Sequence, residues 1–353
     1  ELFAIEKDAF YGSSLKELSL PSSIEELEEG WCNGTSKLIN ISISLNSKKF
    51  SIMNEKFLIM KSEPNLNFYD VLVFAPRDIE RIIVPSFITI ISSSCFSGCS
   101  QLNSVTFSED SELRVIEKQA FLNSSIETFS LPIHVEKICE GAFSRCKSLR
   151  IFEIEDQCEL RTIEKNAFAE SPIEVFNISD KIDNLENGWC GFTSKLTFIF
   201  ISKNNSKYNK YNVKIIISKK DKNLDEEEDN KEKDDKEEEK DKEEEEEIYE
   251  NFEFCERDIN EVKLPDFIQH IKSHCFSDCN QLENIEISDK SKLTIIGEYS
   301  FTNSSIRTIF IPKELKEIKE FSFSGCKNLH TINFSQESTL EIIGKQSFSN
   351  TMI

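Results

Sequence analysis

The chain has 353 residues, 64 of them acidic and 42 basic, and carries a formal net charge of −22. This acidic balance argues against a nucleic-acid partner, because neutralising phosphates requires an excess of Lys and Arg. No run of 18 apolar residues occurs, so we expect no membrane span in this stretch.

The sequence repeats itself on a long scale. Residues 77–79 (Arg-Asp-Ile) return at 257–259, an offset of 180, and residues 30–32 (Gly-Trp-Cys) return at 188–190, an offset of 158. The two offsets differ by 22, roughly the size of an acidic block at 221–247 that holds 18 Asp or Glu and 6 Lys. The pattern indicates a parent unit of about 158 residues whose second copy carries an acidic insertion.

A shorter period lies inside this unit. An apolar-x-x-apolar-x-apolar pattern recurs every 23 or 24 residues within each run, and its last three positions alternate as in a strand with one buried face. A second short pattern follows and ends in a Phe. The strand pattern begins at Leu15, Leu38, Ile79, Leu102, Ile126, Leu149, Ile173, Leu196, Ile259, Leu282, Ile306 and Leu329, and the Phe recurs at 96, 121, 143, 168, 276, 301, 323 and 348.

A unit this short cannot close a hydrophobic core, so successive coils must stack with strands ~4.8 Å apart. The sequence predicts an α/β-type repeat solenoid dominated by β, with about 12 coils, a parallel sheet on one face and continuous columns of buried Phe.

The coils fall into three runs, at 1–45, 77–203 and 257–353, joined into one continuous solenoid. Residues 46–76 and 204–256 break the rhythm and are interpreted as hairpin-like insertions, the second with a disordered acidic loop at 221–247. Both ends of the sequence fall in mid-coil, so we expect a fragment of a longer protein, whose compartment the ends do not reveal.

The repeat resembles the BspA-like leucine-rich-repeat surface proteins. The likeness rests on the phrase small residue-Phe-x-x-Cys-x-x-Leu in the line from Ile138 to Ile154, which returns from Ile271 to Ile287 and from Ile318 to Phe334. The resemblance implies surface display, binding of protein or host matrix, and no catalysis. One departure is that Cys or Asn lies three residues before the strand pattern, at Cys99, Asn123, Cys146, Cys279, Asn303 and Cys326.

The eleven cysteines are interpreted as buried, reduced thiols. Cys99 and Cys146 lie two coils apart, about 10 Å, beyond the ~7 Å reach of a disulfide. A bridge within one turn, Cys95 to Cys99 or Cys275 to Cys279, remains an alternative. The set His270, His274, Cys275 and Cys279 looks like a zinc site, but the first copy has Ile and Ser in place of the histidines. We therefore expect no metal, no cofactor and no catalytic residue.

The outward side of the predicted strands is the candidate protein-binding face. It combines small hydroxyls with a few aromatics, and Phe198, Phe200 and Phe310 would be its anchors. Alternatively, these three rings pack beneath the flanking insertion, above all Phe198 and Phe200, which lie next to residues 204–256. The candidate positions are Arg81, Ser104, Thr106, Thr128, Ile151, Glu153, Val175, Phe198, Phe200, Asn284, Glu286, Thr308 and Phe310.

Seven Asn-x-Ser/Thr sequons are possible N-glycosylation sites. Three of them fall on the predicted strand face, where a glycan would obstruct binding, so glycosylation and binding compete as hypotheses there. The seven are Asn33, Asn40, Asn123, Asn177, Asn204, Asn303 and Asn333.

The sequence thus favours a non-catalytic protein-binding repeat module, a cell-surface or secreted antigen or adhesin that engages host-cell or extracellular-matrix proteins. The alternative is a cytoplasmic leucine-rich-repeat scaffold or regulatory protein with an acidic partner-binding loop. Free thiols and unoccupied sequons would favour the second. The oligomeric state and the identity of the partner are not encoded in these patterns.

Overall fold

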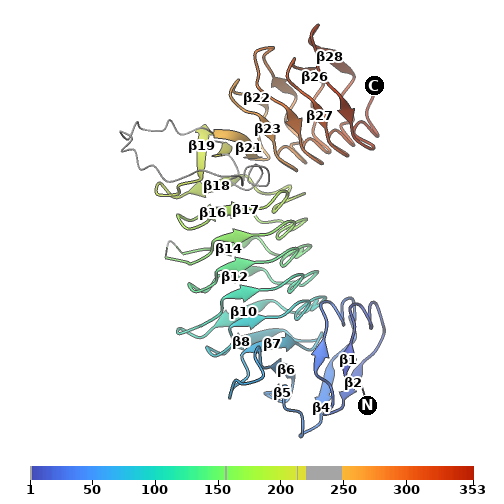
Figure 1. The fold of residues 1–353 in the computed structure, drawn as a ribbon, viewed down its shortest axis with the longest axis vertical. Helices are drawn as coiled ribbons and strands as arrows, with labels where there is room; N and C mark the ends of the chain where they lie inside the picture. The colour runs from blue at the N-terminus through green and yellow to red at the C-terminus, as the bar shows by residue number, and fades with distance from the viewer. Residues whose placement is uncertain (1, 156, 213, 220–248) are drawn as a thin grey trace, which may run out of the picture.

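The computed structural model describes residues 2–155, 157–212, 214–219 and 249–353. The chain forms a solenoid in three segments, which correspond to the predicted runs 1–45 (the first segment), 77–203 (the central segment) and 257–353 (the last segment). The first and last segments bend to the same side of the central segment (Figure 1). The expectations for the acidic block at 221–247 lie outside the described residues. In the part of the chain that the structure covers, no helix has the length and hydropathy needed to cross a bilayer.

A strand forms at each of the twelve predicted positions, so the β-dominated solenoid is confirmed, and the described residues contain no helix. Each of these strands runs parallel to the one in the neighbouring coil, for example Val175–Ile178 against Phe198–Ile201 in full register. The twelve are β2 (Glu17–Leu20), β4 (Asn40–Ile43), β8 (Arg81–Val84), β10 (Ser104–Phe107), β12 (Thr128–Ser130), β14 (Ile151–Glu153), β16 (Val175–Ile178), β18 (Phe198–Ile201), β22 (Glu261–Lys263), β24 (Asn284–Glu286), β26 (Thr308–Ile311) and β28 (Thr331–Phe334).

The second short pattern of each coil gives a two-residue strand, and these form a second parallel row. One side chain of most pairs is buried, as the apolar spacing requires. The strands are β1 (Ala4–Ile5), β3 (Glu26–Leu27), β9 (Ile90–Ile91), β11 (Val115–Ile116), β13 (Lys137–Ile138), β15 (Thr162–Ile163), β17 (Asn184–Leu185), β23 (His270–Ile271), β25 (Ile295–Ile296), β27 (Glu317–Ile318) and β29 (Ile342–Ile343).

The third side of each coil is a turn around the recurrent Phe, and we call this side the turn face. A residue with positive φ stands on each side of the Phe, such as Gln119 (φ 56°) and Asn123 (φ 57°) around Phe121. These two residues have the left-handed backbone conformation, and they orient the peptide groups between them parallel to the axis of the stack. The backbone N–H of Phe121 donates to the carbonyl of Ala142 in the next coil at 2.7 Å. Each coil therefore has a third hydrogen-bonded ladder to its neighbour.

The Phe side chains stack inside the turn face as predicted, but not in one unbroken column. In the central segment the rings of residues 96, 121, 143 and 168 lie 4.8, 5.0 and 5.5 Å apart, and in the last segment those of 276, 301, 323 and 348 lie 4.8, 4.9 and 5.0 Å apart. Cys32 and Cys190 take the Phe position in the last coil before each insertion. The spine is thus interrupted twice.

Each insertion is a three-stranded antiparallel layer, one strand more than a hairpin. The strands are β5 (Phe50–Met53), β6 (Phe57–Met60) and β7 (Val71–Phe74) in the first, and β19 (Tyr208–Asn212), β20 (Ile215–Lys219) and β21 (Tyr249–Cys255) in the second. The third strand of each also pairs in parallel with the first short strand of the following segment, β7 with β9 and β21 with β23.

These layers separate three hydrophobic cores. Val71 and Val73 pack into the core of the first segment, whereas Leu72 packs into that of the central segment. In the second layer Phe254 belongs to the central core and Phe252 to the last one. A strand buried on both faces is apolar at every position in the first layer, where β7 is Val-Leu-Val-Phe. In the second layer β21 also buries Asn251 and Glu253, and both side chains bond the Ser218 hydroxyl.

A buried Arg completes each layer. Arg77, 2% exposed, donates from Nη1 to the Cys95 carbonyl at 2.7 Å, and its guanidinium lies 4.6 Å from the Phe74 ring centre. Arg257 bonds the Cys275 carbonyl at 2.7 Å in the same way. These carbonyls belong to the first coil of a segment, where the insertion takes the place of a preceding coil. The N–H of Ala75 donates to the Cys95 carbonyl and that of Cys255 to the Cys275 carbonyl, each at 3.2 Å. The two arginines therefore add a second donor at the ends of the ladders that the insertions interrupt.

Truncation of the central spine tests this packing. Phe143 is fully buried between Phe121 and Phe168, so Phe143→Ala should lower the free energy of unfolding by about 3–5 kcal/mol in urea titrations followed by circular dichroism. The control Phe200→Ala removes the same atoms from an exposed ring and should shift unfolding by less than about 1 kcal/mol. Equal shifts in the two variants would contradict the stacked core.

Candidate binding surfaces

The predicted strand face lies where the alternation places it. Of the thirteen candidate side chains, eleven are exposed, and Ser104 and Phe310 are half-buried. The residues between them, such as Phe152 and Ile199, are buried. Phe310 packs partly against the core of the last segment, so it offers less contact area than the sequence suggested. The binding role of the face stays a prediction.

Four apolar side chains gather at one end of this face. Ile151, Val175 and Phe198 are register partners on neighbouring strands β14, β16 and β18, and Phe200 follows on β18. Their exposed fractions are 51%, 45%, 37% and 54% in that order. The rings of Phe198 and Phe200 lie 4.5 Å apart. We call these four residues the apolar row.

The neighbouring insertion does not bury the two phenylalanines, so the alternative of packing beneath it is wrong. Lys210 of β19 places its Nζ 4.7 Å from the Phe198 ring centre, which covers that ring only in part. Around the apolar row the face is polar. Ser130 donates to the Glu153 carboxylate, and the Nδ2 of Asn177 donates to the Ile154 carbonyl at 3.2 Å.

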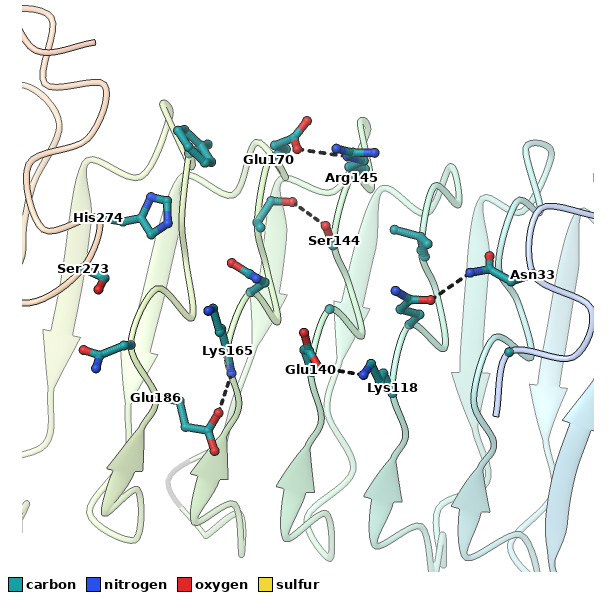
Figure 2. A pocket seen from close by; sticks show the side chains of 18 of the residues that line it. Asn33, Lys118, Glu140, Ser144, Arg145, Lys165, Glu170, Glu186, Ser273 and His274 are labelled. Carbon is teal, nitrogen blue, oxygen red and sulfur yellow. Dashed lines mark hydrogen bonds and ion pairs between the residues drawn. The ribbon is translucent and has the colours of Figure 1, made fainter. Parts of the chain in front are cut away.

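A second surface is a groove of about 1130 Å³ between the turn faces of the three segments (Figure 2). Its floor is the turn face of the central segment. One wall comes from the first segment, with Tyr11 and Asn33, and the other from the last segment, with His274 and Tyr299. The groove exists because both insertions bend the stack towards the same side, and the repeat pattern contains no sign of that direction.

The charged side chains of the groove are largely paired with one another. Lys118 binds Glu140 at 2.8 Å and Glu29 of the first segment at 3.4 Å, and Arg145 binds Glu170 at 2.9 Å. The hydrogen bond to Glu140 is the main reason that the pKa of Lys118 is raised. The groove therefore presents alternating, compensated charge.

The two inner corners of the groove are closed differently. At the first corner, Asn33 donates from Nδ2 to the Gln119 Oε1 at 2.9 Å and accepts from the Ser97 hydroxyl at 3.2 Å. At the second corner, the His274 ring stacks on Tyr299 at 5.0 Å and meets Phe192 edge-on at 4.6 Å. The first corner is thus polar and the second aromatic.

His274 fits tightly against the central segment. A Cβ on Gly188 would come within 2.8 Å of its ring, so that position requires glycine. Burial, helped by the charges of Arg257 and Lys165, lowers the pKa of His274 from 6.5 to about 3, and the ring is neutral at physiological pH. Its Nδ1 is buried without a hydrogen-bond partner.

All eleven cysteines are free thiols, ten of them buried and Cys139 half-buried, which confirms their interpretation as small core residues. Burial raises the pKa of Cys146 and of Cys190 to about 12. Cys275 and Cys279 of the suspected zinc quartet lie in the core of the last segment, whereas His274 lines the groove. Among the described residues, no group of three or more His, Cys, Asp or Glu side chains is placed to hold a metal ion.

The sequons differ in their accessibility. Asn33, Asn177 and Asn303 each use Nδ2, the atom that would carry a glycan, to donate a hydrogen bond within the fold. The remaining four are exposed, and two of them lie on the long strands β4 and β28. These four are Asn40, Asn123, Asn204 and Asn333.

Comparison with known proteins agrees with this architecture. The family model of the BspA type leucine rich repeat region, in six copies, matches residues 1–71, 70–197 and 247–353. The crystal structure of the pneumococcal vaccine antigen PcpA is similar, with a TM-score of 0.61 at 15% identity over 86% of this chain and 88% of that one. A leucine rich cell surface protein of Faecalibacterium prausnitzii A2-165 gives a TM-score of 0.49 at 15% identity over 95% and 93%. At this identity the likeness shows the fold alone. A search of curated proteins gave no match.

The buried His274 predicts a pH dependence of stability. The pKa of His274 is lower in the folded state than in the unfolded state. Between about pH 6.5 and about pH 3 this histidine is therefore protonated in the unfolded chain and neutral in the folded one. The free energy of unfolding should fall by up to ~1.4 kcal/mol per pH unit across this window from this residue alone. His274→Gln should flatten the difference between urea titrations at pH 7 and pH 4. The exposed-site control His330→Gln should keep the wild-type profile, and an unchanged profile in His274→Gln would contradict the assignment.

Proposed function

Because the chain belongs to the BspA-type leucine-rich-repeat family, we propose that it is a non-catalytic protein-binding module, displayed at the cell surface or secreted, that engages a partner protein through the strand face of its central segment. The observation that carries this proposal is the apolar row, Ile151, Val175, Phe198 and Phe200, exposed on a rigid parallel sheet.

The physical support comes from how protein interfaces are built. Their binding energy concentrates in a few large side chains at the centre of a polar rim. The apolar row supplies two aromatic anchors whose backbone is fixed by ladder hydrogen bonds, so little conformational entropy is lost on binding. Thr128, Ser130 and Glu153 supply the rim.

The charge of the chain suggests the character of the partner. At a net charge of −22, attraction favours a contact surface that is basic around an apolar centre. A host-cell or extracellular-matrix protein with such a surface is the proposed ligand. PcpA, the similar structure named above, is described as a vaccine antigen, which supports surface display as the setting.

One observation favours a second candidate, a cytoplasmic scaffold. The described residues contain eleven free thiols and no disulfide, as expected of a reducing compartment. Mass spectrometry of the protein taken from its source cells separates the two settings. Glycosylated Asn40 or Asn123 would place it in the secretory route, whereas unmodified sequons with a cytosolic fractionation pattern would support the scaffold.

A double substitution tests the strand face. The wild type is first screened by surface plasmon resonance against a panel of extracellular-matrix and host-cell surface proteins. The double variant Phe198→Ser with Phe200→Ser should bind the protein found in this screen at least about tenfold more weakly. The control Phe87→Ser removes an exposed ring outside the strand face and should leave the affinity unchanged. Wild-type affinity in the double variant would refute the proposed surface.

A further inference from the structure

We propose that the groove between the three turn faces is a second binding site, and that it takes a neutral oligosaccharide. The groove lies on the turn face, away from the strand face proposed to bind protein, so the two sites are independent. Four properties of the groove lead to this ligand: its floor, its charge, its hydrogen-bonding groups and its aromatic walls.

The floor follows four successive coils of the central segment, about 14 Å. Gly141, Ser144 and Ala169 line it between longer polar side chains, so a ligand can approach the backbone closely at these three positions. The same turn position recurs in each of the four coils. A floor with this repeat suits an extended chain of similar units.

The charge of the groove is nearly balanced although the protein is strongly acidic. Five basic and six acidic side chains line it, a net charge of 5 − 6 = −1. The Lys118–Glu140 and Arg145–Glu170 pairs already satisfy each other at 2.8 and 2.9 Å. A highly charged ligand, whether a nucleic acid, an acidic polysaccharide or a basic peptide, would gain no net attraction and would have to break these pairs. The ligand is therefore uncharged.

The remaining polar groups call for a ligand that both donates and accepts hydrogen bonds. The amides of Asn166 and Asn187 line the groove beside the paired carboxylates and ammonium groups. A hydroxyl group is both donor and acceptor, so a polyhydroxylated chain can match either kind of partner at each position. His274, 7% exposed and facing the groove in Figure 2, adds a neutral imidazole ring to the wall, while its unpartnered Nδ1 is buried.

Aromatic side chains stand on both walls. Tyr11 on the first segment is 69% exposed, and Tyr299 on the last segment is half-buried. Such rings present an apolar body with a polar tip, which matches the mixed apolar and hydroxylated surface of a sugar. Phe192, His274 and Tyr299 all hold positive φ, of 57°, 59° and 54°. Bulky residues rarely adopt this conformation. The central coils hold Ser94, Gln119, Gly141, Asn166 and Gly188 at the position of His274 and Tyr299, so aromatic rings are kept at this wall despite the strain.

A peptide ligand is disfavoured by the way the groove is built. Extended peptides are usually recognised by pairing with an open strand edge or by apolar grooves. Here the lining residues belong to turns whose backbone groups already bond from coil to coil, such as Gln119 N–H to the Glu140 carbonyl at 3.0 Å. The described part of the central segment thus offers no row of unpaired backbone N–H and C=O groups along the floor of the groove.

The test is an array of neutral linear hexasaccharides of glucose, mannose, galactose and N-acetylglucosamine, followed by isothermal titration calorimetry with the strongest binder. We expect a dissociation constant between about 10 μM and 1 mM. Ser144→Arg, which fills the floor, should weaken binding at least tenfold. The matched control is Ser324→Arg, the same position one repeat later (144 + 180 = 324), which lies outside the groove.

Circular dichroism shows whether each variant folds. If Ser144→Arg does not, Tyr11→Ala replaces it, because that ring is mostly exposed, and it should weaken binding in the same way. The double variant at Phe198 and Phe200 should bind the sugar as the wild type does, which keeps this test separate from the strand-face proposal. Absence of binding to every hexasaccharide at about 5 mM would overturn the inference. An equal loss of sugar affinity in Ser144→Arg and Ser324→Arg would also overturn it. So would a peptide that binds the wild type and no longer binds Ser144→Arg.

Discussion

The structure depends on backbone hydrogen bonds that only a neighbouring coil can complete. Each coil leaves donors and acceptors unpaired on three sides, at the long strand, the short strand and the turn around Phe. An unpaired buried peptide group costs about 1–3 kcal/mol, so a coil without its neighbour is unstable. Stacking also closes the core, because the rings of Phe121, Phe143 and Phe168 lie against one another from coil to coil.

The same constraint explains the insertions. Wherever a ladder is interrupted, its end groups need other partners, and the third strand of each insertion together with Arg77 or Arg257 supplies them. The apolar layer between two cores then sets a new direction for the stack. Trp31 and Trp189 pack against Phe74 and Phe254 of these layers, so the two bends share one construction.

Two surfaces follow from this arrangement, and they differ in kind. The strand face is set by local alternation and presents its apolar row on a single rigid sheet. The groove is formed by the bends. It brings together residues of all three segments, from Lys7 in the first to Lys319 in the last. Its polar and aromatic corners show that both bends are held by contacts between turn faces, such as Asn33 with Gln119 and Phe192 with His274.

The sequence by itself determined the coil. The 23-residue period placed the twelve long strands of the coils, and alternation identified which of their side chains point outward, because these features depend on neighbours within a few residues. It also contained the signals of the bends, the repeated Gly-Trp-Cys and Arg-Asp-Ile, without revealing their role. Only the tertiary structure decided that the core is divided in three, that Phe310 is half-buried and that a groove exists. These properties depend on the direction in which one stack packs against the next, and that direction is fixed by long-range packing rather than by any local pattern.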